Sequence, residues 1–179
     1  MNNLKAMLAI GLSLTTSALA DEATEKVRKI DSLYKSGLTA MKQGKAAEAT
    51  NAFKSVLKLN PRHGHARYQL ARVGSVTAQV QLAQRKASFT KINLEKVHFT
   101  DATLAEALEA VNELTLKASD KKFSPNFVIQ DPKETLKDRK VSLQMNNAPL
   151  SAILTYILDG VGATARYDAH ATVIRPTGK

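Results

Sequence analysis

An internal duplication in the second half of the chain sets the strongest limit on its fold. The stretches "HFTDATLAEALEAV", from His98, and "QMNNAPLSAILTYI", from Gln144, align without a gap at an offset of 46 residues. Each copy reads as the end of a strand, followed by apolar residues three and four positions apart, which is typical of an amphipathic helix. We therefore expect one strand–helix unit to be used twice.

Both predicted helices begin at equivalent positions. Asp101 and Asn147 are the expected N-caps, and Thr103 and Pro149 follow as residues suited to a first helical turn. Thr103 with Glu106 offers a second possible cap for the first helix. The second helix carries one apolar stripe, formed by Leu150, Ile153, Leu154, Ile157, Leu158 and Val161, and its expected end is marked by Gly160 and Gly162.

Extended runs follow both helices. "NFVIQ" begins at Asn126, and "ATARYDAHATVIR" begins at Ala163 and is expected to turn near Asp168 as a hairpin. The resulting order is strand, helix, strand, strand, helix, strand, strand (βαββαββ). We predict an α+β fold in which a small mixed sheet is covered on one face by two helices.

This order, together with "VSLQMNNAPLSAILTYILDGVGATARYDAHATVIRP", resembles the secretin and TonB short N-terminal domain. The resemblance covers Lys91 to Pro176, and its most specific part is the polar-Ala-Pro-Leu start of the second helix. It implies a module without catalytic activity that binds neighbouring machinery in secretins, or an inner-membrane regulator in TonB-dependent signalling receptors. No barrel-forming segment follows, so we do not expect this chain to be the channel or receptor itself.

Small sheets commonly bind partners through edge strands, whose backbone groups accept a strand from another protein. The strand before the second helix alternates apolar and polar residues, with Val141, Leu143 and Met145 on one face. We predict these three residues as candidate protein-binding positions.

The part of the chain that precedes this domain is predicted to be helical. "IDSLYKSGLTAMKQGKAAEATNAFKSVLKLNP", from Ile30, divides into two helices at "KQGK", with Gly44 in the left-handed position that ends the first. The stretch resembles one tetratricopeptide repeat, because it keeps that family's order of a small residue, a turn residue, a second small residue, a large residue and a residue that stops the helix. In this chain they are, in that order, Gly37, Gly44, Ala49, Phe53 and Pro61. Phe53 is a further candidate protein-binding residue.

A single repeat of this kind cannot bury its apolar face by stacking on neighbours. "GHARYQLARVGSVTAQVQLAQRKA", from Gly64, is the nearest candidate for a covering third helix, although Gly74 is a possible break. Two interpretations stay open: a helical platform with a ligand groove, or a helical spacer without one. The helical domain is predicted over residues 21–88 and the α+β domain over residues 90–176.

The N-terminus has the pattern of an export signal. "MNNLKAMLAIGLSLTTSALA" contains one Lys, then a long uncharged run and a small-x-small ending at Ala20. Residues 1–20 are therefore predicted to be a signal peptide that is cleaved near Ala20, which implies a periplasmic protein of the bacterial envelope. The chain contains no Cys, so it uses neither disulfides nor thiolate metal sites.

The chain is strongly basic. Its net charge of +10 falls to +9 when the predicted signal, with Lys5, is removed. Aromatic residues make up only 5% of the chain and the lysines are scattered, which disfavours a nucleic-acid groove because such grooves interleave the two types. For an exported protein, anionic glycan, lipid headgroups or acidic protein faces are the expected partners.

No catalytic chemistry is predicted from the motifs. His63 and His65 alternate as metal ligands can, but no third ligand is near, so we expect no metal and no cofactor. Glu106 and Glu109 fit a solvated helix face better than a pair of catalytic carboxylates. The chain contains neither a nucleophile elbow nor a Gly-rich phosphate loop.

These observations predict an exported adaptor without enzymatic activity that binds other envelope proteins. The expected partners are secretin or outer-membrane transport machinery, or copies of the chain itself. The alternative is a cationic binder of anionic envelope glycan or lipid headgroups, for which the net charge is the reason. The charged stretch "QDPKETLKDRK", from Gln130, is either a contact surface or a solvated connection.

Overall fold

A computed structural model describes residues 4–178, with side chains described from residue 21 to residue 178. The predicted signal over residues 1–20 lies outside the part with described side chains, and its cleavage stays a prediction. The chain divides into two compact units, residues 1–80 and residues 81–179, and each is described by itself. Within the described residues, no helix is long and apolar enough to cross a membrane.

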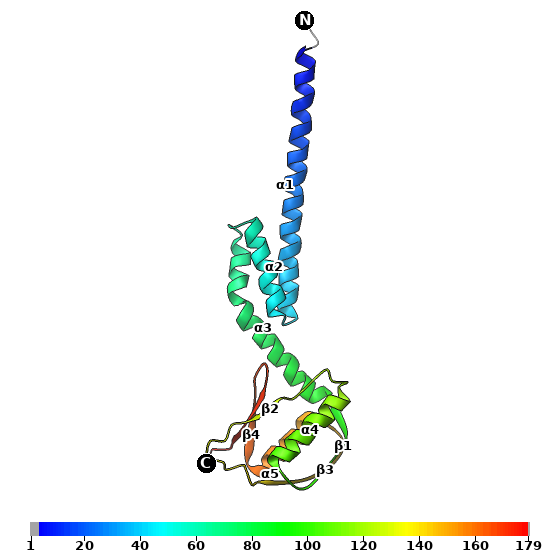
Figure 1. Cartoon of the computed structure of the whole chain (residues 1–179), viewed down its shortest axis with the longest axis vertical. Helices are drawn as coiled ribbons and strands as arrows, with labels where there is room; N and C mark the ends of the chain where they lie inside the picture. Colours follow the sequence, from blue (N-terminus) through cyan, green and yellow to red (C-terminus); the bar gives the residue numbers. More distant parts are fainter. Residues whose placement is uncertain (1–3, 179) are drawn as a thin grey trace. The chain divides into compact units, whose positions relative to one another are not determined.

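The first unit is a helical hairpin with a covering helix (Figure 1). It consists of α1 (Leu4–Lys42), α2 (Ala46–Leu59) and the first part of α3 (Gly64–Lys91). Gly44 lies between α1 and α2 with a φ of 75°, the left-handed conformation expected there. The helix from Gly64 is not broken at Gly74, because α3 runs unbroken to Lys91.

The core of this unit forms where α1 and α2 meet. Gly37 on α1 packs so closely on the Phe53 ring that a Cβ at Gly37 would lie 2.6 Å from a ring carbon. The Tyr34 ring, one turn earlier on α1, also packs against the Phe53 ring, at 5.7 Å between centroids. α3 covers this core through Ala66 and Val73, which are buried in the same cluster.

The second unit has five strands and two helices after the end of α3, and it confirms the predicted α+β class. In chain order the elements are β1 (Asn93–Thr103), α4 (Leu104–Ala118), β2 (Phe127–Ile129), β3 (Lys140–Pro149), α5 (Leu150–Val161), β4 (Ala163–Tyr167) and β5 (Thr172–Pro176).

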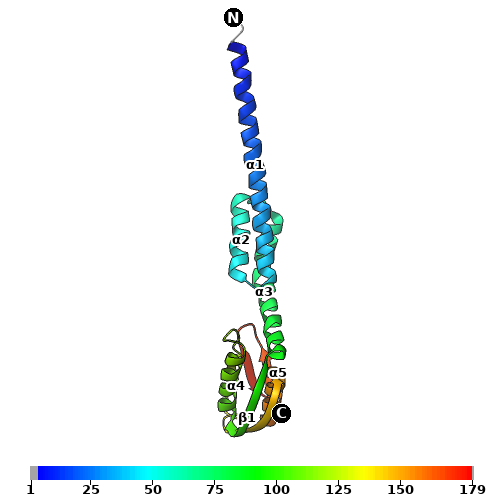
Figure 2. The same cartoon turned by 90° about the vertical axis from the view of Figure 1, so that its right-hand side faces the viewer.

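The strands form two sheets rather than the single mixed sheet expected from the sequence. β1 pairs only with β3, antiparallel, and β5 lies between β2, its parallel neighbour, and β4, its antiparallel neighbour. Figure 1 shows α4 and α5 between the two sheets, and Figure 2 shows both helices beside β1. The expectation of helices on one face of one sheet is therefore wrong, because no ladder joins the β1–β3 pair to the other three strands.

The duplication explains why β1 and β3 pair with each other. His98 lies opposite Gln144, and these two residues are equivalents in the aligned copies. The two copies are thus related by an approximate twofold axis at this pair. The first residues of both helices also make similar bonds to the other copy: Leu104 N–H donates to Arg139 C=O, and Leu150 N–H donates to Ile92 C=O.

The equivalent residues Asp101 and Asn147 bend the chain instead of capping the helices. Their φ values are 53° and 47°, a left-handed conformation that Asp and Asn tolerate better than most residues. The N-caps are Thr103 and Pro149, two residues later. The prediction of Asp101 and Asn147 as caps is wrong, because both residues still belong to strands, which run on to Thr103 and Pro149 before the helices begin.

The last turns of α3 belong to the core of the second unit, beginning earlier than the predicted domain start at residue 90. Phe89 is buried against the rings of Phe123, Phe127 and Tyr167, with the Tyr167 ring closest at 4.9 Å between centroids. Burial raises the pKa of Tyr167 above its ordinary value. α3 is therefore the N-terminal structural element of this core.

Candidate functional site

The residues predicted to bind proteins are core residues. Phe53 is 0% exposed and Val141 is 5% exposed, while Leu143 and Met145 are half-buried against the core of the second unit. Their side chains are consequently not available as a contact surface. β3 keeps one edge without a strand partner among the described residues, but its outward side chains are polar.

The groups considered for metal or acid–base chemistry have structural roles or stand alone. His63 Nδ1 accepts the Ala66 N–H at the start of α3, and Glu106 accepts from the Thr103 hydroxyl and N–H in a capping box. These two bonds hold the pKa of Glu106 below its ordinary value. Across residues 21–178 no group of three His, Cys, Asp or Glu side chains is placed to hold a metal ion.

The most open apolar strand is β2, at one edge of the three-stranded sheet. Val128 is 45% exposed and Ile129 is 41% exposed, whereas Leu94 and Val97 on β1 are buried. An edge strand presents a row of unpaired backbone groups, so exposed apolar side chains beside it mark a surface that favours another strand. β2 is therefore our candidate site.

The bonds to β5 define which backbone groups of β2 are free. Asn126 C=O accepts the Thr172 N–H, and Gln130 N–H donates to Ile174 C=O. Backbone groups alternate in direction along a strand, so Val128 faces β5 like Asn126 and Gln130, while Phe127 and Ile129 turn their N–H and C=O toward the open edge. No strand of the described residues pairs with that edge, so β2 offers two donors and two acceptors to an added strand.

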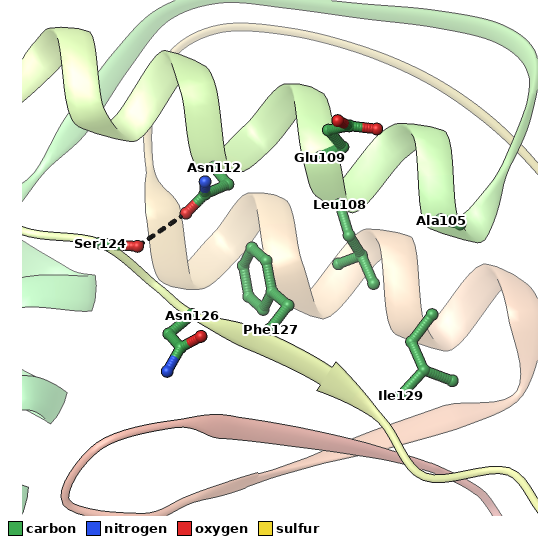
Figure 3. Close-up of a pocket in the computed structure, with 8 residues that line it drawn as sticks. All are labelled: Ala105, Leu108, Glu109, Asn112, Ser124, Asn126, Phe127 and Ile129. Atoms are coloured by element: carbon green, nitrogen blue, oxygen red, sulfur yellow. Dashed lines mark hydrogen bonds between the residues drawn. The ribbon is translucent and has the colours of Figure 1, made fainter.

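An apolar cavity of about 280 Å³ lies beside this edge, between β2 and α4. Figure 3 shows Leu108 from α4 and Phe127 and Ile129 from β2 pointing into the space between the two elements. Asn112 and Ser124 close one end, where the Ser124 hydroxyl donates to Asn112 Oδ1 at 2.9 Å. The cavity therefore has an apolar floor and a polar end.

A second cavity of about 310 Å³ adjoins the first, since Ala105 and Ile129 line both. Its apolar walls are Leu104 and Leu136, and its charged residues come from the stretch after β2. That stretch, left open from sequence as either a contact surface or a solvated connection, forms one wall of this cavity. We call the two cavities together the β2 groove.

The start of β2 is held by a buried arginine. The Arg85 guanidinium donates to Pro125 C=O and to the Thr172 hydroxyl, which itself donates to Pro125 C=O at 3.0 Å. Arg85 also lies over the Phe123 ring, 5.5 Å from its centroid, and burial lowers its pKa from the ordinary value. Asn126 Nδ2 donates to His170 C=O at 2.7 Å, so β2 is anchored where it begins.

Sequence reasoning missed both this groove and an uneven distribution of charge. Between Glu48 and Glu95 the chain contains no acidic residue but has eight Lys and Arg residues. Apart from buried Arg85 these side chains are exposed, and none pairs with a carboxylate of the described chain. Counting acids along the sequence reveals this basic stretch, whereas the groove required the tertiary structure.

No protein family, curated protein or solved structure matches this chain. The resemblances to the secretin and TonB domain and to the tetratricopeptide repeat consequently rest on the residues quoted above. What the chain does must be argued from the geometry of its own backbone and side chains.

Proposed function

We propose that this chain is a protein-interaction module that binds an extended segment of another protein by adding it as a strand to β2. One observation carries the proposal: the free N–H and C=O groups of Phe127 and Ile129 lie beside an apolar groove. Strand addition gains affinity from main-chain hydrogen bonds and specificity from pockets for alternate side chains, and the β2 groove supplies both.

The buried anchor supports this role. Because Arg85, Thr172 and Asn126 hold the start of β2, an incoming segment meets a strand that is already extended. A preorganised edge lowers the entropy cost of binding.

In cellular terms, we propose an exported adaptor of the bacterial envelope that performs no catalysis and uses no cofactor. The export pattern at Ala20 and the resemblance to the periplasmic domain of secretins and TonB-dependent signalling receptors support this assignment. The helical first unit is then a platform or a spacer for the binding domain.

In-cell photo-crosslinking identifies the partner. A photoreactive residue at Val128, on the exposed strand, is expected to trap one or a few envelope proteins. The same residue at Tyr156, which is 61% exposed on α5, is the matched control and is expected to trap none of them specifically. Identical patterns from both positions would contradict the proposal.

Two substitutions at one position then test the strand edge with the trapped partner. Ile129→Pro removes the outward N–H, and edge strands tolerate Pro where the N–H faces solvent. Ile129→Ala shortens the side chain but keeps the N–H. We expect I129P to fold and to lose binding at least about tenfold relative to I129A, the order of one hydrogen bond in a desolvated interface. Equal affinities would exclude strand addition at this edge.

The basic stretch between Glu48 and Glu95 favours a second function, binding of anionic glycan or lipid headgroups through the first unit. The triple variant Lys54→Gln, Lys58→Gln, Arg62→Gln is expected to lose binding to phosphatidylglycerol vesicles. Removing the same number of charges at Lys121, Lys122 and Lys133 is the control. Because exposed charges are screened, this binding must collapse at high salt, whereas strand addition must not.

A further inference from the structure

We infer that the β2 groove selects an extended segment with two apolar side chains, two residues apart, flanked by basic residues. The inference rests on the proposed function and adds the chemistry of the partner. It is drawn from the arrangement of the two cavities and from the charges that line them.

The apolar part follows from strand geometry. Side chains on one face of a strand recur every second residue, about 7 Å apart. The β2 groove consists of two cavities that share Ala105 and Ile129, so they lie next to each other along β2. A strand paired with Phe127 and Ile129 places one side chain over Leu108 and the next on the same face over Leu104 and Leu136.

The residue between these two side chains points away from the groove. On β2 itself, Val128 occupies the corresponding face and is 45% exposed. The central residue of the partner is accordingly unconstrained by the cavities. The pattern is therefore apolar, any residue, apolar.

The basic part follows from the lining charges. The charged residues that line the groove are Glu109, Asp131 and Glu134 and one cation, Lys137, whose Nζ lies 3.0 Å from Glu134 Oε2. The Glu109 carboxylate lies at the rim, on the side of α4 that faces away from β2 (Figure 3). This local excess of negative charge belongs to a chain whose net charge is +10. The net positive charge of the chain attracts acidic segments, so the preference for basic segments rests on the groove alone. There an acidic segment meets three acidic residues and no free cation, whereas a basic segment meets two carboxylates without a cationic partner.

Three labelled, end-capped peptides test the inference with the full chain by fluorescence anisotropy: KTLTLTK, ETLTLTE and KTTTTTK. Each charged residue lies two positions from an apolar position, so its side chain shares the face that meets the groove. We expect KTLTLTK to bind most tightly. ETLTLTE should bind about five- to tenfold more weakly, as two exposed ion pairs allow, and this difference should shrink in high salt. KTTTTTK should show no measurable binding, because it has the charges without the apolar side chains.

Variants of the groove give the reciprocal test. Glu109→Lys is expected to weaken binding of KTLTLTK and to strengthen binding of ETLTLTE. Ala105→Phe fills both cavities from an exposed helix position, so it should abolish binding of both peptides while the far-UV circular dichroism stays unchanged. Ala47→Phe, at an exposed position of α2 in the other unit, is the matched control.

The outcomes separate this inference from the proposed function. Equal binding of KTLTLTK and ETLTLTE, or no effect of E109K, overturns the basic preference and leaves strand addition standing. Binding that survives Ala105→Phe overturns the assignment of the apolar side chains to the cavities. If an N-methyl group on the central Thr leaves KTLTLTK binding intact and I129P matches I129A, strand addition itself is wrong.

Discussion

The close packing of α1 on α2 depends on the absence of a Cβ at Gly37, where the backbone contacts the Phe53 ring. The Phe53 ring is 0% exposed and contacts both Gly37 and Tyr34 of α1, so it has little room to move. Only a residue without a Cβ permits this approach, which is why the small-then-large order of the predicted repeat matters physically.

Gly37→Ala is predicted to destabilise the first unit by about 1–3 kcal/mol, the usual effect of overpacking a filled core. Urea unfolding of the full chain, followed by far-UV circular dichroism, measures the change. Gly74→Ala is the control, because a Cβ there meets nothing within 4 Å and Ala is the better helix former. Equal stability of G37A and the unchanged chain would show that α1 and α2 separate more easily than this contact indicates.

Among the elements, α4 is the helix whose start depends most clearly on its own sequence. Thr103 and Glu106 form a reciprocal capping box, in which the Glu106 N–H donates to the Thr103 hydroxyl and the Glu106 carboxylate accepts in return. Because Leu104 N–H also donates to Arg139 C=O, this cap links α4 to the beginning of β3.

The capping box predicts a pH dependence. A carboxylate whose folded pKa is lowered contributes stability above its unfolded pKa, and the contribution disappears as pH falls through the folded value. The chain should therefore be more stable than its Glu106→Gln variant at pH 6, and this difference should shrink as the pH falls below the ordinary Glu value of about 4.3. Urea midpoints across this range measure it, with Glu109→Gln as the control for a carboxylate on α4 outside the box. A constant difference would contradict the assignment.

At the scale of the whole molecule, the chain folds around two separate cores, and α3 contributes residues to both. Val73 is buried in the first core and Phe89 in the second, although both lie on one helix. The end of α3 also carries Arg85, which anchors β2, so the candidate binding edge depends on residues that precede its own domain in the sequence prediction.

Phe89→Ala is predicted to destabilise the second unit by about 3–5 kcal/mol, as expected for truncating a buried aromatic residue. Amide hydrogen exchange of β5 measures this loss in the full chain. Tyr68→Ala, on the same helix but 57% exposed, should leave β5 protection unchanged.

The same contact predicts the behaviour of two fragments of the second unit. A fragment that begins at Gln81, and so keeps the last turns of α3, should be more stable than one that begins at Ile92. Similar stabilities of these fragments would show that α3 is dispensable for the second core.

The candidate site illustrates why the sequence suggests an exposed edge strand but does not say which strand it is. Alternation along Val141, Leu143 and Met145 indicates a strand with one buried face, and the structure places that face in the core. "NFVIQ" is equally apolar, and nothing local distinguishes an edge strand from a central one. Edge status depends on which strands pair, and β2 and β5, which form that ladder, are more than forty residues apart in the sequence.

The sequence alone determined the repeated strand–helix unit, the Thr103 cap, the left-handed Gly44 and Gly162, and thereby the α+β class. Each of these depends on neighbours within one or two turns of chain, so local patterns carry the information. The tertiary structure alone decided the split into two sheets, the membership of the last turns of α3 in the second core, and the open edge at β2. These features depend on competition among distant partners for the same backbone groups and apolar surfaces, which no local pattern records.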